Sequence, residues 1–257
     1  MSDYSARLEK AREITAAAAA VSLSFFRNDP ETEIKADQSP VTLADKATEQ
    51  SLRDSLQDQF PGETIFGEEF GRTGEGAAMW IIDPIDGTRS FIAGLPLFGM
   101  LLGYLEDGHP KLGVIHMPAL GEAYAGGEGL PASCNGTPIR TRACRSLDDA
   151  RLFINEGDKL AVSEADVFRR LVRAGQLRRL GADCYPHALV ARGLADAVVD
   201  YDLQPYDYLP VSAVVAAAGG IMTDWQGKPL SMTSDGRTVT AATPELHVEL
   251  LDLLNRP

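Results

Sequence analysis

The chain has 257 residues, of which 44% are hydrophobic and 24% are charged. A chain of this length and composition buries a substantial core, which excludes a disordered protein and gives no indication of a membrane protein. Its formal net charge of −13 argues against a general affinity for nucleic acid or anionic membranes, because both require a surface rich in Lys and Arg.

Two helices are predicted at the N-terminus. Apolar residues recur at helical spacing from Leu8 to Phe25 and predict an amphipathic helix that ends near Asn28. Its apolar stretch is too short to span a bilayer, and the acids before it are unlike the basic flank of a signal peptide. Thr42 and Asp45 have the spacing of a capping box and predict a second helix, which ends near Gln59.

Two short apolar segments are predicted to be strands, and each ends in acidic residues. Residues 64–66 are followed by Gly67-Glu68-Glu69, and residues 79–82 are followed by Asp83-Pro84-Ile85-Asp86-Gly87-Thr88. Both groups of acids are therefore expected at the ends of strands.

The rest of the chain is predicted to form a meander and then alternating elements. The meander has antiparallel strands at 99–105, 111–117 and 122–125 and is closed by Gly126 and Gly127. Beyond residue 138 we expect helices at 166–174, 186–192 and 208–218, strands at 177–180, 197–201, 221–224 and 238–242, and a last helix from Pro244. No internal repeat or long linker divides the chain, which favours one compact unit.

The acids at the strand ends have the chemistry of a divalent-cation site. Carboxylates that lie close together repel one another unless a cation neutralises them, and Mg²⁺ prefers oxygen ligands of this kind. Pro84 fixes a turn that can aim the carboxylates of Asp83 and Asp86 and the carbonyl of Ile85 at one point. The alternative for this loop in isolation is an ordinary turn with solvated acids.

A phosphate site is predicted beside these acids. Gly87 lets the backbone approach a ligand closely, and if residues 88–92 begin a helix, the backbone amides of Gly87 and Thr88 are free to bind a phosphate. Asp207 precedes the helix predicted at 208–218, where it either caps the helix or adds a further acid to the site.

Other reactive side chains are given no role. Cys134, Cys144 and Cys184 form no CxxC pair, which fits reduced thiols in a cytoplasmic protein and argues against a zinc site. His116 and His187 lie near apolar strands, where lone histidines commonly pack or face solvent.

The segment Trp80–Gly94 reads WIIDPIDGTRSFIAG and, with GEE at Gly67–Glu69, closely resembles the inositol monophosphatase superfamily of Mg²⁺-dependent phosphatases. The resemblance extends to VTLAD at 41–45, to GADCYPHALVARGLADAVVD at 181–200, and to Asp207 before an alanine-rich helix. It implies a layered α-β-α-β-α fold for a single phosphatase domain spanning 1–257. Helices and an antiparallel sheet would occupy 1–137, an α/β part would occupy 138–257, and the site would lie between them. A homodimer is also implied.

The resemblance implies a set of metal ligands. Glu68, Asp83 and the Ile85 carbonyl would bind a first Mg²⁺, Asp83, Asp86 and Asp207 would bind a second, and a weaker third ion would use Glu68 and water. A pair of such ions can activate a water and stabilise the leaving alkoxide of a phosphate monoester, without a covalent phosphoenzyme.

It also implies roles for the residues around the phosphate. Thr88, hydrogen-bonded to Asp45, would orient the attacking water, while Gly87 and Thr88 amides would hold the phosphate. Asp86 would face the substrate as well as a metal.

The residues after the acidic loop bear on the substrate. Inositol phosphatases tend to have an Asn-Phe pair there, whereas RSFIAGLP at 89–96 is similar to the histidinol-phosphate phosphatase branch. Asp183, Arg192 and Asp200 occupy positions where family members contact the alcohol part of the substrate, and the acids suit the cationic amine of histidinol. The same residues could instead be two loop acids and a surface cation.

We therefore expect a histidinol-phosphatase of histidine biosynthesis that acts on a small phosphate monoester, with no nucleic-acid or membrane partner. Three alternatives stay open from sequence: an inositol 1-phosphate or broad sugar phosphatase, a phosphatase of 3′-phosphoadenosine nucleotides, and a catalytically silent protein that binds phosphate ligands.

Overall fold

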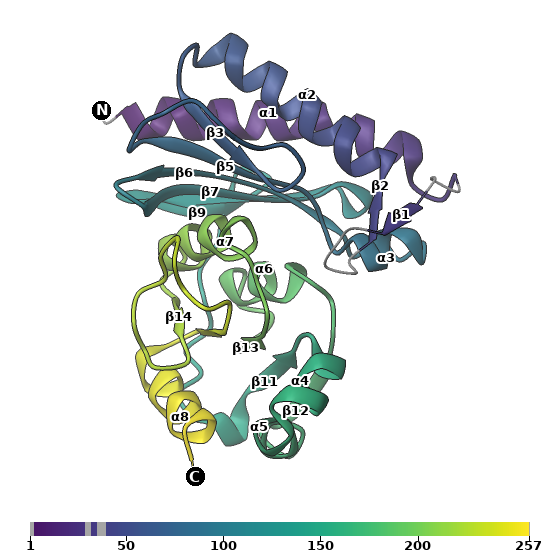
Figure 1. Ribbon diagram of the computed structural model, residues 1–257. Helices are drawn as coiled ribbons and strands as arrows, with labels where there is room; N and C mark the ends of the chain where they lie inside the picture. The colour runs from purple at the N-terminus through teal and green to yellow at the C-terminus, as the bar shows by residue number, and fades with distance from the viewer. Residues whose placement is uncertain (1–2, 29–31, 35–39, 257) are drawn as a thin grey trace.

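The computed structural model describes residues 3–28, 32–34 and 40–256, and the elements within these ranges form five layers (Figure 1). The layers are a pair of helices, a sheet of eight strands, a second helical layer, a sheet of five strands and an outer group of helices. The layered α-β-α-β-α fold implied by the sequence is therefore confirmed.

The helices of the described residues are α1 (Asp3–Phe25), α2 (Leu43–Gln59), α3 (Thr88–Ile92), α4 (Gly157–Ser163), α5 (Ala165–Leu171), α6 (Tyr185–Ala191), α7 (Pro205–Ala217) and α8 (Pro244–Leu254). The N-terminal strands are β1 (Thr32–Ile34), β2 (Pro40–Thr42), β3 (Thr64–Gly67), β4 (Gly71–Thr73), β5 (Met79–Asp86), β6 (Gly99–Glu106), β7 (His109–Met117), β8 (Glu122–Gly127), β9 (Leu130–Cys134) and β10 (Thr137–Pro138). The C-terminal strands are β11 (Arg151–Ile154), β12 (Leu177–Leu180), β13 (Ala197–Asp200), β14 (Ile221–Asp224) and β15 (Thr238–Ala241).

The eight-stranded sheet has the order β10-β9-β8-β7-β6-β5-β3-β4 and is covered on both faces. The first four residues of β5 are all apolar because both faces of the strand are covered: Trp80 and Ile82 pack under α1 and α2, while Met79 and Ile81 pack toward α7. The strand ladder is irregular between Asp83 and Asp86, where the register shifts between the Asp83–Leu101 pair and the Asp86–Gly99 pair.

The pairing of β3 with β5 positions the first acids. The two strands are parallel, with Gly67 opposite Ile82, so both end at the same edge of the sheet. The Glu68 amide donates to the Ile82 carbonyl over 3.2 Å, which sets Glu68 beside Asp83. This parallel pair makes the sheet mixed, whereas the sequence predicted an antiparallel one.

The five-stranded sheet has the order β12-β11-β13-β15-β14, and its outer face packs against α5 and α8. Helices α6 and α7 lie between the two sheets (Figure 1). The first turn of α7 reaches the edge where β3 and β5 end, so it brings a C-terminal residue to the N-terminal acids.

Several predicted elements are present with shifted bounds, and others were missed. The capping box of α2 is confirmed, because the Asp45 carboxylate accepts from the Thr42 amide and the Thr42 hydroxyl accepts from the start of the helix. Gly126 and Gly127 do not close the meander, since β9 and β10 continue it. Strand β11 and helix α4 were not predicted.

Candidate active site

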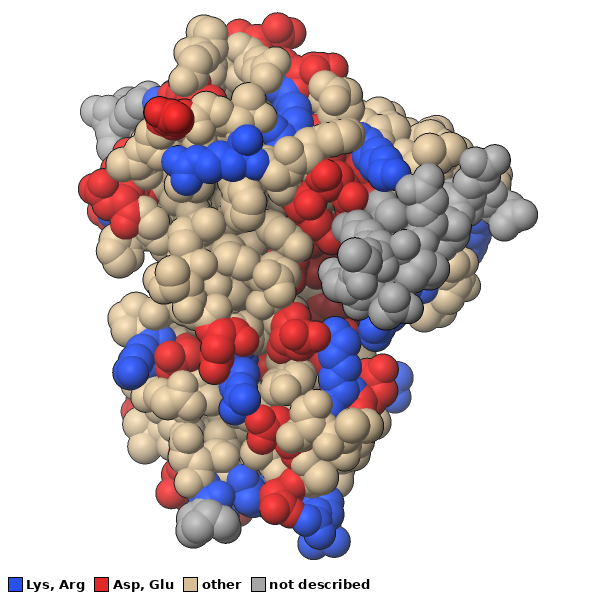
Figure 2. Space-filling model, in the orientation of Figure 1, with Lys and Arg blue, Asp and Glu red and all other residues tan. Residues whose placement is uncertain are grey.

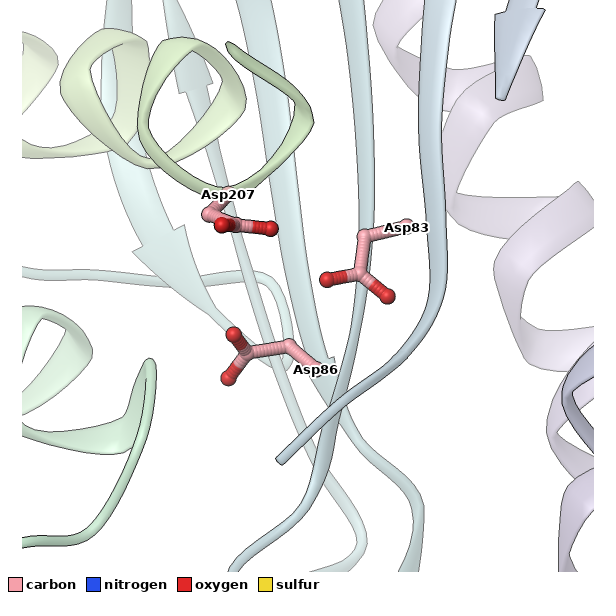
Figure 3. A group of neighbouring side chains, drawn as sticks. All are labelled: Asp83, Asp86 and Asp207. Atoms are coloured by element: carbon pink, nitrogen blue, oxygen red, sulfur yellow. The ribbon is translucent and has the colours of Figure 1, made fainter. Parts of the chain in front are cut away.

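Three carboxylates from two separate stretches of the chain converge in one place. Oxygen atoms of Asp83, Asp86 and Asp207 all lie within 4.8 Å of one another. Figure 3 shows Asp83 and Asp86 on β5 pointing toward Asp207 on the first turn of α7. The prediction that Asp207 joins the acids of the strand end therefore agrees with this geometry.

Asp207 also caps its helix. It is the third residue of α7, and its Oδ2 accepts from the Gln204 amide over 2.7 Å in a capping box. The two alternatives weighed for Asp207 from sequence are thus both present, because the carboxylate caps α7 and also lies within 4.8 Å of the oxygens of Asp83 and Asp86.

The pKa values of this cluster are raised. Burial raises the pKa of Asp207 to about 7, with a further contribution from the charge of Glu68. Burial also raises the pKa of Asp83 well above its usual range, and the charges of Glu68, Asp207 and Asp86 add to it. The pKa of Asp86 is raised in the same way, by burial and then by Asp183 and Asp207. Ionised together, these groups need a cation.

The Thr88 hydroxyl lies between two acceptors. Its Oγ1 is 3.2 Å from Asp45 Oδ1 and 3.1 Å from the Ile85 carbonyl oxygen. Asp45 is fully buried, and its other oxygen accepts from the amide and hydroxyl of Thr42. The predicted Thr88–Asp45 pair is present in the structure.

Gly87 lies where the two parts of the chain approach each other closely. Its φ is +83°, and a Cβ at this position would lie 2.7 Å from Asp183 Cγ, so no other residue fits without displacement. Residues 88–92 do form a helix, α3, with Gly87 as its N-cap. That the amides of Gly87 and Thr88 bind phosphate stays a prediction.

Asp183 and Cys184 bring the C-terminal part against the acidic loop. The Cys184 amide donates to Asp86 Oδ2 over 2.7 Å, and Ser90 Oγ donates to Asp183 Oδ2 over 2.6 Å. The pKa of Asp183 is raised by burial. Asp183 therefore borders the same space as Asp86.

Asp200 lines the cavity as part of a buried polar network. Its Oδ2 accepts from Asn155 Nδ2 over 2.6 Å and lies 3.3 Å from His187 Nε2, while its Oδ1 accepts from the Tyr201 amide over 2.9 Å. His187 Nδ1 is 2.9 Å from the hydroxyl of Thr240. His187, given no role from sequence, is thus part of the wall.

Asn155 was missed although a signal was present. It follows the buried strand β11 directly, just as Glu68 follows β3. Because β11 itself was not predicted, its polar end was not recognised.

Arg192 is the predicted substrate residue that the structure places elsewhere. Its guanidinium donates to Glu122 Oε1 over 2.8 Å and lies 3.4 Å from the Tyr124 hydroxyl. It does not line the cavity described below. A substrate contact from Arg192 is not supported by the geometry of this chain.

The other predicted residues, apart from the fully buried Asp45, line one cavity of about 430 Å³ between the two parts of the chain. Among the lining residues are Glu68, Asp83, Ile85, Asp86, Gly87, Thr88, Asp183, Asp200 and Asp207. Asp and Glu side chains gather along a hollow in the middle of the molecule (Figure 2). Tyr206, whose ring packs against Phe66, completes the wall next to Asp207.

The sequence model of the inositol monophosphatase family matches residues 3–256. The chain belongs to the inositol monophosphatase family. Phosphatases of this family are metal-dependent, and the buried carboxylates of Asp83, Asp86 and Asp207 form a donor set that fits a hard divalent cation.

Individual relatives of the inositol monophosphatase family carry different substrate names. The chain is 37% identical over 233 residues to a histidinol-phosphatase of Chlorobaculum parvum, covering 89% of this chain and 90% of the relative. It is 34% identical over 215 residues to a fructose-1,6-bisphosphatase/inositol-1-monophosphatase of Thermotoga maritima, covering 84% and 82%. A solved inositol monophosphatase from Zymomonas mobilis is 36% identical, with a TM-score of 0.90 over the whole of both chains.

Proposed function

We propose that this chain is a Mg²⁺-dependent phosphatase that hydrolyses histidinol phosphate to histidinol and phosphate. The observation that carries the proposal is the convergence of three carboxylates within 4.8 Å in a cavity bordered by further acids. Hydrolysis of a small phosphate monoester is the activity that fits this family and this cavity.

The acids of the cavity floor would hold the metal. Glu68, Asp83 and the Ile85 carbonyl would bind one Mg²⁺, and Asp83, Asp86 and Asp207 would bind another, all of them lining the cavity. Bound divalent cations supply Lewis acidity and positive charge against the phosphate dianion.

Thr88 and Asp45 would guide the attacking water. The Thr88 hydroxyl has one proton, so while it donates to Asp45 Oδ1 its own lone pairs are free to accept a proton from a water. Two hydrogen bonds from Thr42 hold the Asp45 carboxylate in the orientation in which it can receive the proton from Thr88. The pair therefore orients a water and receives its proton.

The acidic wall favours a cationic alcohol. Beyond the metal ligands, the cavity is lined by the carboxylates of Asp183, Asp200, Glu156 and Asp202. Within the described residues, its only cationic side chains are those of Arg89 and Lys159. Lys159 is already paired, at 2.7 Å from Glu156 and 2.9 Å from Asp202. A wall of this sign attracts the protonated amine of histidinol and gives no such advantage to inositol.

The names of relatives support this substrate without deciding it. Histidinol-phosphatases of Chlorobaculum parvum, Mycobacterium tuberculosis and Streptomyces coelicolor are 37%, 33% and 31% identical. An inositol-1-monophosphatase of Mycolicibacterium smegmatis is 32% identical, so an inositol phosphate is the second candidate.

A substrate panel with titrated Mg²⁺ tests the proposal. Initial rates are measured on histidinol phosphate, inositol 1-phosphate and 3′-phosphoadenosine 5′-phosphate, with Asp86→Asn as an inactive control. One ionic contact to the amine is worth about tenfold, so kcat/KM for histidinol phosphate should exceed the others by at least roughly that factor. Faster turnover of either other ester refutes the substrate, and inertness toward all three refutes the phosphatase activity.

A further inference from the structure

A line of buried charged residues runs along helix α2. Asp45, Glu49 and Arg53 recur every four residues and therefore share one face of the helix. Their relative exposures are 0%, 0% and 4%, although charged residues are rarely buried this deeply. Only Asp45 has a place in the function described so far.

Glu49 is bonded to the loop that carries Glu68. Its Oε2 accepts from the Glu69 amide over 2.7 Å, and its Oε1 accepts from the Phe70 amide over 3.2 Å. A Cβ on Gly67 would lie 2.1 Å from Glu49 Oε1, so the carboxylate packs directly against the backbone at Gly67. Glu49 thus fixes the residues on both sides of Glu68.

Arg53 completes this arrangement from the next turn of α2. Its Nε donates to Glu49 Oε1 over 2.7 Å, its Nη1 donates to Thr73 Oγ1 over 3.1 Å, and its Nη2 donates to the Gly71 carbonyl. The guanidinium therefore holds both Glu49 and strand β4, which follows the loop.

Stability alone does not account for a buried ion pair at this position. The desolvation cost of two buried charges roughly cancels their attraction, and apolar residues of similar size are commonly as stable. What apolar side chains cannot do is accept hydrogen bonds from the amides of the loop, because these need an acceptor at a fixed place.

We propose that Glu49 and Arg53 are positioning residues that hold the Glu68 carboxylate at the metal site. Since Asp45 on the same helix face binds the Thr88 hydroxyl, α2 sets the position of the metal ligand relative to the water-orienting group. The inference rests on the proposed function, because it takes Glu68 as a metal ligand.

The test compares Mg²⁺ binding by three variants, by calorimetry with Mg²⁺ alone and without substrate. Glu49→Gln keeps the volume but removes the charge and one acceptor, and Glu68→Gln removes the ligand itself. Loss of a supporting partner typically weakens metal binding by about 10–100-fold, so Glu49→Gln should weaken Mg²⁺ binding by roughly tenfold. Its kcat at saturating Mg²⁺ should stay close to that of the wild type, because Thr88 and Asp45 are untouched.

Asp196→Asn is the matched control. Asp196 is also a fully buried carboxylate, bonded to Arg142 at 2.7 Å and to the Arg151 amide at 2.8 Å, but it lies in the C-terminal part outside the cavity. Its loss should lower the melting temperature without changing Mg²⁺ binding. If Asp196→Asn weakens Mg²⁺ binding as much as Glu49→Gln, general destabilisation explains both and the positioning role is refuted.

The other outcomes separate the inference from the proposed function. Weak binding by Glu68→Gln together with wild-type binding by Glu49→Gln overturns the positioning role alone. Wild-type binding by Glu68→Gln overturns the ligand assignment and the inference with it. If Glu49→Gln does not fold, Arg53→Lys takes its place, because lysine keeps the charge but cannot reach Thr73 and Gly71 together. Unchanged Mg²⁺ binding by Arg53→Lys also overturns the positioning role.

Discussion

Thr88 has one hydroxyl proton and two acceptors within reach of it. Donation to Asp45 is the arrangement that the proposed relay requires, because a proton that Thr88 accepts from a water could then pass on to the carboxylate. Burial raises the pKa of Asp45, and the hydrogen bonds from Thr42 and Thr88 oppose that rise. A carboxylate with a raised pKa is a better proton acceptor, which suits the proposed relay from water.

Replacement of Thr88 by Ala should therefore affect turnover more than metal binding. Removal of a group that handles a proton in the transition state typically costs about 10²–10⁴-fold in rate, so kcat should fall by roughly 10²-fold or more. Mg²⁺ binding measured by calorimetry should remain within about twofold of the wild type. Thr88→Ser retains the hydroxyl and should keep most of the activity. Equal kcat in the Ala and Ser variants would contradict the role of the hydroxyl.

Helix α7 reaches the site because a row of glycines lets it lie against the sheet. Gly103, Gly113 and Gly126 are opposite one another on β6, β7 and β8. A Cβ on Gly113 would lie 1.9 Å from the Pro210 carbonyl oxygen, and one on Gly126 would lie 2.6 Å from Ala217 Cβ. The distance from α7 to the sheet thus decides where Asp207 stands at its first turn.

Gly113→Ala should shift helix α7 and, with it, Asp207. The added methyl meets backbone, so α7 must shift, and overpacking of this kind costs about 1–3 kcal/mol. We expect a lower free energy of unfolding in urea and weaker Mg²⁺ binding, although no residue that lines the cavity is substituted. Gly157→Ala is the control, because its Cβ would have ordinary contacts of 3.5 Å and 3.7 Å. Unaltered Mg²⁺ binding in Gly113→Ala would show that α7 does not set the position of Asp207.

At the scale of the molecule, the fold buries several carboxyl groups close together in one cavity, where they repel one another once they are ionised. The two parts of the chain close over Asp83, Asp86 and Asp207, whose pKa values are all raised, first by burial. In the unfolded chain these groups ionise near pH 4. The metal-free native protein therefore holds protons that the unfolded chain has already lost.

The stability of the metal-free protein should accordingly fall as the pH rises from about 4 to about 7. Stability decreases wherever the native state binds more protons than the unfolded state, by up to about 1.4 kcal/mol per pH unit for each such carboxyl. Above the pKa of about 7 for Asp207 its contribution is fully lost. Mg²⁺ needs the ionised carboxylates, so it should raise the melting temperature more at pH 8 than at pH 5.

Thermal unfolding in EDTA and in Mg²⁺ measures this dependence. Asp207→Asn keeps an acceptor for the Gln204 amide but has no proton to lose, so the metal-free variant should lose less stability with rising pH than the wild type. An identical pH dependence of wild type and Asp207→Asn would contradict the raised pKa.

Sequence alone was sufficient for the elements whose pattern is local. The capping box of α2 and strand β5 with its acidic end follow from neighbouring residues, and both are present. Periodicity and turn chemistry act over a few residues, so they can be read without the fold. Short strand β11 has little of either, and its polar end, Asn155, was lost with it.

No helix of the described residues has the length and apolar character to cross a membrane. The cysteines Cys134, Cys144 and Cys184 are free, as their spacing predicted, and all three are buried. These properties depend on composition and spacing, which the sequence states directly.

By itself, then, the sequence determined which acids stand at strand ends and which chemistry they suit. Only the tertiary structure decided that Asp207 meets Asp83, that Glu49 and Arg53 bond to the loop after Glu68, and that Arg192 pairs with Glu122 outside the cavity. These contacts join stretches far apart in the chain, and they form only when helices and sheets pack, because no local pattern specifies which distant surfaces will meet.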